Sequence, residues 1–233
     1  MTRPSYKSAL IVGAGPGLSA SLARLLVRNG MSVALAGRDP AKLKTLCAET
    51  GATAYACDAQ DERQVARLFD ALDQRQGPPD VVIYNASARA RGPLTTLSPD
   101  DVRSTLMVSA FGAFLVAQRA AAGMLAKGSG AILFTGASAS VKGYAESAPF
   151  AMGKFALRGL AQSMARELAP KGIHVAHFVI DGAIRRPGQT DPAERPDSTL
   201  DPDAIADTYL HILMQPRSAW TWEVELRPWV ERF

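Results

Sequence analysis

The stretch LIVGAGPGLSASLARLLVR, residues 10–28, joins a short apolar run, a glycine-rich turn and a helical pattern. Residues 9–12 are apolar and predict a strand, and leucines at helical spacing after residue 17 predict a helix. Such a turn lets backbone N–H groups and the positive end of the helix dipole face a pyrophosphate. Glycines also serve tight turns that bind nothing, but this position between strand and helix favours a dinucleotide site. The predicted phosphate contacts are Gly13, Gly15, Pro16, Gly17 and Leu18.

The composition indicates one globular domain over residues 1–233. Hydrophobic residues make up 47% of the chain, and no linker or low-complexity tract divides it. A net charge of +4 suits an anionic nucleotide but is too small and dispersed to indicate nucleic-acid binding. Cys47 and Cys57 have no disulfide or metal-ligand spacing, so no metal is expected. Because no signal peptide or long apolar span precedes the first strand, we expect a cytoplasmic protein without a membrane partner.

Strand and helix patterns alternate along the rest of the chain. Further strands are predicted at residues 32–36, 53–57, 81–84, 131–135, 173–180 and 222–226, and helices at 40–50, 62–73, 98–125, 149–168 and 201–214. Continuously apolar strands between amphipathic helices predict a parallel sheet covered on both faces. The expected fold is therefore α/β, a Rossmann-like doubly wound parallel sheet of about seven strands. Residues 181–200 are polar and proline-bearing, and we expect them to form a mobile flap over a substrate site.

Arg38 follows the second predicted strand, where the ribose of a dinucleotide is bound in this kind of fold. An acid there would accept from the 2′-hydroxyl, whereas an arginine suits a 2′-phosphate. Arg38 thus favours NADP(H) over NAD(H), although an arginine at a helix entry can also be merely solvated. His174, His177 and His211 have no partners at ligand spacing and are interpreted as structural.

These motifs resemble the short-chain dehydrogenase/reductase family over nearly the full chain. The family's T-G-x3-G-x-G falls on residues 12–19, with the opening Thr and last Gly replaced. The family's N-N-A-G falls on residues 84–87, and its P-G on Asp181 and Gly182. The Thr that meets the nicotinamide amide in the family falls on Arg186. The resemblance implies a nicotinamide cofactor with contacts at Asp58, Ala59, Asn85, Ala86, Lys154, Gly182 and Ile184.

The resemblance also locates the catalytic positions, and most of them are changed. The Y-x3-K pair falls on Phe150 and Lys154, so only the lysine is retained. The family serine falls on Ala137, next to Ser138, and the asparagine falls on Ser109. The chain therefore looks like an atypical branch with Phe in place of the catalytic Tyr. In the family, the tyrosine passes a proton to the substrate oxygen, and the lysine lowers its pKa and binds the nicotinamide ribose.

Phenylalanine has no hydroxyl and cannot act as a general acid. Three explanations remain open. Tyr144, Ser138 or Ser140 could supply the proton, although Tyr144 also reads as a loop aromatic and the serines as turn residues. The substrate could be a protonated imine that needs no acid, with Phe150 as an apolar or cation-facing wall. The chain could also bind the nucleotide without redox turnover, as a sensor, scaffold or enzyme partner.

The remaining expectations concern substrate and subunits. We expect a small carbonyl or imine substrate to enter above Phe150, walled by Tyr144 and residues 184–200. Arg185 and Arg186 would attract an anionic group there or face solvent. The resemblance implies a homodimer or homotetramer, assembled through the Ala/Gly-rich stretch 110–126 and the helix after Pro149.

Overall fold

The computed structural model describes residues 4–231, which form a parallel sheet of seven strands in the order β3-β2-β1-β4-β5-β6-β7. The strands are β1 (Ser8–Val12), β2 (Ser32–Gly37), β3 (Thr53–Ala56), β4 (Val81–Tyr84), β5 (Gly130–Thr135), β6 (Ile173–Ile180) and β7 (Glu223–Leu226). The helices are α1 (Leu18–Arg28), α2 (Lys44–Thr50), α3 (Glu62–Gln76), α4 (Pro99–Leu106), α5 (Gly112–Lys127), α6 (Ala148–Leu168) and α7 (Pro202–Leu213). The predicted doubly wound α/β fold is confirmed.

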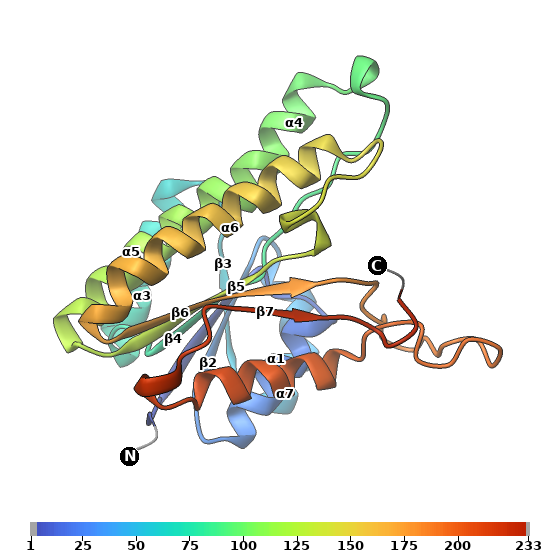
Figure 1. Cartoon of the computed structure of the whole chain (residues 1–233). Helices are drawn as coiled ribbons and strands as arrows, with labels where there is room; N and C mark the ends of the chain where they lie inside the picture. The colour runs from blue at the N-terminus through green and yellow to red at the C-terminus, as the bar shows by residue number, and fades with distance from the viewer. Residues whose placement is uncertain (1–3, 232–233) are drawn as a thin grey trace.

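Helices cover both faces of the sheet (Figure 1). One core cluster lies between the sheet and helices α1 and α7, and the other lies between the sheet and helices α3, α5 and α6. Strands β1, β4, β5 and β6 are buried along their whole length, which explains their continuous apolar sequences. The strand order reverses between β1 and β4, and ligands of open α/β sheets bind beside such a reversal at the carboxyl ends of the strands.

Helix α3 runs to Gln76, three residues beyond the predicted end, and two other predicted helices are irregular. The helix expected at 40–50 opens as a 3-10 turn, Pro40–Leu43, because Asp39 accepts a hydrogen bond from the Ala41 N–H and so tightens the first turn. The helix expected at 98–125 runs on to Lys127 and contains a π-helical segment, Met107–Phe111. There the Tyr84 hydroxyl donates to the carbonyl of Val108, which offers that carbonyl a partner outside the helix. The Ser98 side chain makes no capping hydrogen bond.

The continuous helix from Pro99 to Lys127 is long and apolar enough to cross a membrane by length and composition alone. Part of it packs on the sheet instead, through residues such as Ala113, Val116 and Ala120. Only 39% of its most apolar window is buried, so an apolar face remains exposed.

Two of the three histidines lie in strand β6 and are buried. The His174 ring stacks on Trp220 at 4.6 Å between centroids, and the ring of His177 contacts Glu223 at 3.1 Å. His211 lies exposed on α7. No group of three metal-ligating side chains occurs among residues 4–231.

Helix α6 approaches α4 and the π-helical segment most closely at Gly153. A Cβ there would lie 2.9 Å from the Ser109 Cβ. We predict that Gly153→Ala lowers the free energy of unfolding, because overpacking of about 1–3 kcal/mol exceeds the helix-propensity gain of up to about 1 kcal/mol. Gly159→Ala is the matched control, since a Cβ at that position meets no atom within 4 Å. Urea unfolding should show opposite signs for the two variants, and stabilisation by both would contradict this packing.

Candidate active site

The glycine-rich turn follows β1 and is fixed by contact with the next strand along the sheet. Gly13 adopts φ +84°, and a Cβ on it would lie 2.3 Å from the Ala86 backbone nitrogen. The N–H groups of Gly13 and Ala14 both donate to the Ala36 carbonyl, at 2.9 and 3.0 Å. The conformation and packing of the turn therefore require glycine at position 13, whether or not a ligand binds.

Gly15 and Gly17 differ, because a Cβ at either would meet no atom within 4 Å. Gly17 is the N-cap of α1, and no side chain caps the first turn of that helix. The N–H groups of a first helical turn have no partners within the helix, and the helix dipole adds positive potential there. The turn thus leaves open space and free donors where a pyrophosphate would bind.

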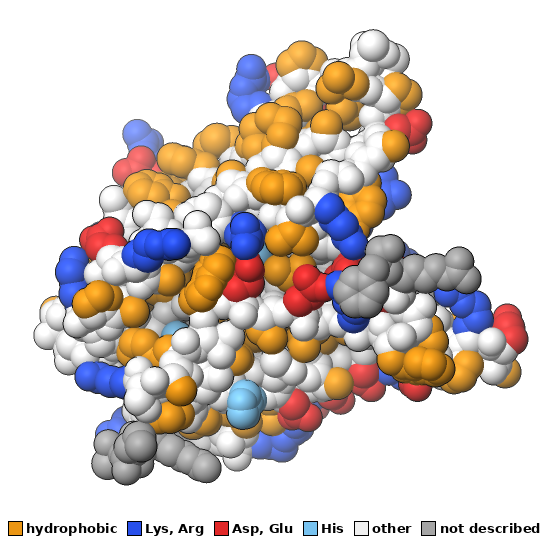
Figure 2. Space-filling view, in the orientation of Figure 1, with side chains coloured by type: hydrophobic (Ala, Val, Ile, Leu, Met, Phe, Trp, Pro, Cys, Tyr) orange, Lys and Arg blue, Asp and Glu red, His pale blue; other side chains and the backbone are white. Residues whose placement is uncertain are grey.

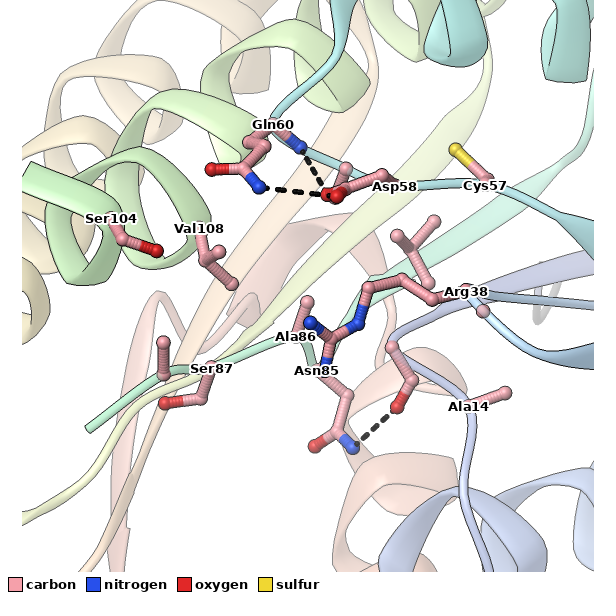
Figure 3. A pocket seen from close by; sticks show the side chains of 15 residues that line it. Ala14, Arg38, Cys57, Asp58, Gln60, Asn85, Ala86, Ser87, Ser104 and Val108 are labelled. Atoms are coloured by element: carbon pink, nitrogen blue, oxygen red, sulfur yellow. Dashed lines mark hydrogen bonds between the residues drawn. The ribbon is translucent and has the colours of Figure 1, made fainter. Parts of the chain in front are cut away.

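A cleft of about 330 Å³ opens beside this turn (Figure 3). Six of the predicted cofactor contacts line it: Gly13, Arg38, Asp58, Ala59, Asn85 and Ala86. They come from the ends of β1, β2, β3 and β4, which are separated in sequence and adjacent in the sheet. The remaining wall includes Gln60, Ser87, Ser104 and Val108, which the sequence analysis did not single out.

The polar groups in the cleft are held in defined positions. The guanidinium of Arg38 points into the cleft toward Ala86 (Figure 3). The Asp58 carboxylate accepts from the Gln60 N–H at 3.2 Å and from the Gln60 side-chain amide at 3.1 Å. Asn85 donates from Nδ2 to the Ser19 hydroxyl at 2.8 Å, which ties the end of β4 to the start of α1. In this structure Asn85 therefore fixes the glycine-rich turn as well as lining the cleft.

Lys154 lies on α6 and is 3% exposed. Its ammonium donates to the Thr135 carbonyl at 2.8 Å, at the carboxyl end of β5. Burial, aided by the positive charge of Arg89, lowers the pKa of Lys154 to about 7. Lys154, to which the family resemblance assigns a catalytic role, therefore binds the end of a central strand from within the fold.

Arg89 is a site residue that the sequence analysis missed. Its guanidinium carbon lies 4.0 Å from the centroid of the Phe150 ring, and the Lys154 Nζ lies 5.8 Å from the same centroid. Phe150 is 6% exposed, so the ring is a buried wall that already faces a cation of the chain itself. Arg89 follows β4 in an irregular loop, and no periodic pattern could have placed it over a ring on α6.

The three hydroxyl groups predicted as candidate proton donors differ in burial and in hydrogen bonding. The Ser140 hydroxyl is buried and accepts from the Ala137 N–H at 3.1 Å, as a turn residue would. Ser138 begins the same 3-10 turn and is partly exposed. Tyr144 is 47% exposed, with the Lys142 Nζ 5.9 Å from its ring centroid. Ser109, at the family's asparagine position, is buried in the π-helical segment. A catalytic role for Tyr144, Ser138 or Ser140 stays a prediction.

The expected flap, residues 181–200, is closed at its base. Gly182 has φ +154°, and a Cβ on it would lie 2.8 Å from the Pro228 Cδ. Ile184 pairs with Leu200 in an isolated bridge, and Arg185 forms an ion pair with Asp201 at 2.9 Å. The loop beyond them projects from the body of the molecule (Figure 1, orange). The cleft beside the glycine-rich turn is not lined by residues 181–200, so the contacts expected from Gly182 and Ile184 stay a prediction.

Comparison with known proteins identifies the family. The model of the short chain dehydrogenases matches residues 7–189. The chain belongs to the short-chain dehydrogenase family. It is 29% identical to an uncharacterised oxidoreductase of Staphylococcus aureus, over 98% of this chain and 100% of that one. It is 30% identical to the 3-oxoacyl-[acyl-carrier-protein] reductase MabA of Mycobacterium bovis, over 76% of this chain and 69% of that one.

Solved structures agree with this assignment. A short-chain dehydrogenase from Rhodopseudomonas palustris is 35% identical and superposes with a TM-score of 0.84, over 97% of this chain and 100% of that one. A metagenomic short-chain oxidoreductase in complex with NADP is 26% identical, also with a TM-score of 0.84, over 97% and 98% of the two chains. The family binds a nicotinamide cofactor, and the residues described above fit one. Gly15 and Gly17 leave space for it, and the first turn of α1 leaves donors.

The lowered pKa of Lys154 predicts a pH dependence of stability. In the folded chain this ammonium loses its proton above about pH 7, whereas its ordinary pKa is 10.5. The unfolded chain therefore binds more protons between these values, and stability rises with pH across that window. We predict that the free energy of unfolding of the wild type increases relative to that of Lys154→Met as the pH rises from about 7 to about 10.5. The gain should be on the order of a few kcal/mol.

Denaturant unfolding at a series of pH values measures this difference. Lys44→Met is the matched control, because Lys44 is an exposed lysine at the start of α2. If the wild-type and Lys154→Met curves stay parallel through the window, the ammonium is not buried as described.

Proposed function

We propose that the protein is an NADP(H)-dependent oxidoreductase that reduces a small carbonyl substrate. The observation that carries the proposal is one cleft lined by Gly13 and Ala14 of the glycine-rich turn together with Arg38 and Asp58. The family resemblance implies that the acid at the end of β3 contacts the adenine amino group, and an arginine at the end of β2 suits a 2′-phosphate. The complex of the metagenomic relative with NADP supports the same preference.

The retained chemistry centres on Lys154. When bound, the reduced nicotinamide supplies a hydride. Lys154 would hold the nicotinamide ribose through its Nζ, which already has one partner in the Thr135 carbonyl. Phe150 transfers no proton and would exclude water from one side of the reacting centre. The proton for the substrate oxygen would come from solvent or from one of the hydroxyl groups of Tyr144, Ser138 and Ser140.

The position of Arg89 favours a carbonyl over an imine. A protonated imine would have to bind near the Phe150 ring, where Arg89 lies at 4.0 Å from the ring centroid and Lys154 at 5.8 Å. Like charges at such distances in a partly desolvated site repel. An uncharged carbonyl avoids this repulsion. It also benefits from the nearby positive charge, because that charge stabilises the oxyanion formed by hydride addition.

Nucleotide binding without redox turnover is the second candidate function. The observation that favours it is Phe150 itself, because loss of a positioned general acid typically costs about 10²–10⁴ in rate. Tight binding of NADPH with no consumption of it, across panels of carbonyl and cyclic imine substrates, would support this candidate over reduction.

A homo-oligomer is proposed from the exposed apolar face of α5, α6 and the π-helical segment. Phe111, Phe114, Met152 and Phe155 are each 41–49% exposed. Figure 2 shows hydrophobic side chains gathered along the helices on this side of the molecule. Apolar patches of this kind commonly mark protein–protein or membrane contacts, and burial against a second copy would form a dimer or tetramer. A cytoplasmic location remains part of the proposal.

Arg38→Ala tests the cofactor preference. Loss of charge-assisted hydrogen bonds to a 2′-phosphate costs about 1.5–3 kcal/mol, so NADPH should bind roughly 10–100-fold more weakly. The affinity for NADH should change less than about threefold, since that cofactor has no 2′-phosphate. Fluorescence titration measures both, and consumption of NADPH with the carbonyl and imine panels tests turnover. Arg28→Ala, on the exposed last turn of α1, is the matched control. Equal losses for both cofactors would contradict the role of Arg38.

Light scattering tests the proposed assembly. The wild type should have the mass of a dimer or tetramer, and Phe155→Glu should lower that mass, because it places a charge in the apolar face. Lys44→Glu is the control, because Lys44 is exposed on the opposite side of the sheet, and it should leave the mass unchanged. A wild-type monomer at micromolar concentration would contradict the assembly.

A further inference from the structure

Arg89 is positively charged, yet no acidic side chain among residues 4–231 forms an ion pair with it. Arg24, Arg119, Arg158 and Arg185 each form an ion pair with a carboxylate. Among residues 4–231, no carboxylate lies within ion-pair distance of the Arg89 guanidinium. Its contact is instead the ring of Phe150, with the guanidinium carbon 4.0 Å from the centroid. Arg89 is an exposed residue overall, but partial desolvation of its guanidinium lowers its pKa, and the nearby charge of Arg91 lowers it further, so the two guanidinium groups repel each other.

Arg89 and Arg91 line a second cavity of about 350 Å³. Ala88 and Ser104 line both this cavity and the cleft beside the glycine-rich turn, so the two spaces are neighbours. Asp101 is the acid in the lining of the second cavity, and it forms no ion pair with either arginine. The second cavity therefore offers two cations to a ligand at the end of the cleft that is remote from Arg38.

The ring of Phe150 gives Arg89 a fixed place. A guanidinium over an aromatic face gains cation–π attraction, and its N–H donors stay at the rim of the group, free to bind oxygen. Two donors at that rim match the two oxygens of a carboxylate or of a phosphate. Lys154 faces the same ring, so a ligand bound to Arg89 would lie close to the proposed nicotinamide end of the site.

We propose that Arg89 binds the carboxylate or phosphate of an anionic carbonyl substrate. This inference rests on the proposed reductase function and names its substrate class. Phe150 then acts as the platform that orients Arg89, a role for which a ring suffices without a hydroxyl. Arg91 adds positive potential at the outer end of the same cavity.

The first test uses matched substrates with NADPH. An oxo acid is compared with its methyl ester, and a phosphorylated carbonyl compound with its unphosphorylated alcohol. The wild type should reduce one anionic member with at least about tenfold higher kcat/KM than its neutral partner, and the better anion identifies carboxylate or phosphate. Arg89→Met should lose about 10–100-fold with the anion and less than about threefold with the neutral partner. Arg89→Lys should fall between the two.

Arg28→Met removes one positive charge far from both cavities and is the matched control for net charge. It should leave the ratio of anionic to neutral kcat/KM unchanged. Equal losses for both members of a pair in Arg89→Met would overturn the inference and leave Arg89 with a structural role. A wild type that shows no preference for either anion would also overturn it.

The second test needs no turnover. Malonate and inorganic phosphate are titrated calorimetrically into the protein saturated with NADP⁺ and into the protein alone. Binding that Arg89→Met weakens at least about tenfold, and Arg28→Met does not, supports the inference even if no substrate is reduced. Failure to bind NADP⁺ would refute the proposed function. The titration of anions into the protein without NADP⁺ would then decide whether Arg89 binds an anion. Reduction of neutral carbonyls without Arg89-dependent anion binding would refute the inference alone.

Discussion

The site depends on the hydrogen bond between the buried ammonium of Lys154 and the Thr135 carbonyl. Burying a cation is costly unless it is hydrogen-bonded, so this contact fixes the position of α6 on the end of β5. The hydroxyl of Thr135 bonds to that of Tyr209 at 2.9 Å on the other face of the sheet. The end of β5 is thereby held by helices α6 and α7 together. A rigid strand end lets Lys154, and with it Phe150 one helical turn away on α6, keep a fixed place near the end of β5.

The family resemblance implies that Phe150 stands at the position of the catalytic tyrosine, a replacement that would change the chemistry of that position more than its shape. The Arg89 guanidinium and the Lys154 amino group lie near the ring, so their positive charge would favour the ionised form of a phenol placed there, whereas burial would oppose it. Phenylalanine keeps the ring and cannot ionise. The surroundings therefore stabilise negative charge at a position where this chain has no hydroxyl to carry it. Under the proposed function that charge would come from the ligand, either as the oxyanion of the reacting carbonyl or as a separate anionic group.

The sequence predicted the parts of the fold that rest on local patterns. Buried parallel strands read as apolar runs, and β4 and β6 were predicted with the bounds that the structure shows. The glycine-rich turn and Arg38 followed from their place after a strand. Arg89 could not be predicted, because its contact with Phe150 joins an irregular loop to a distant helix. The π-helical segment coincides with the hydrogen bond from the Tyr84 hydroxyl and the close packing of Gly153 on Ser109, long-range contacts that no local pattern encodes.

Under the proposed function, the energy of binding an anion at Arg89 would be large enough to offset the absence of a tyrosine acid. General acid catalysis of 10²–10⁴ corresponds to about 3–5 kcal/mol of transition-state stabilisation. Two hydrogen bonds to a charged group contribute about 1.5–3 kcal/mol each. Such energy accelerates reaction only when it serves the transition state, by holding the carbonyl carbon in line for hydride transfer. A guanidinium held by a buried ring meets that condition, because the ring limits the positions it can adopt. An anionic group at one end of the substrate would then set the orientation of the reacting carbonyl at the other.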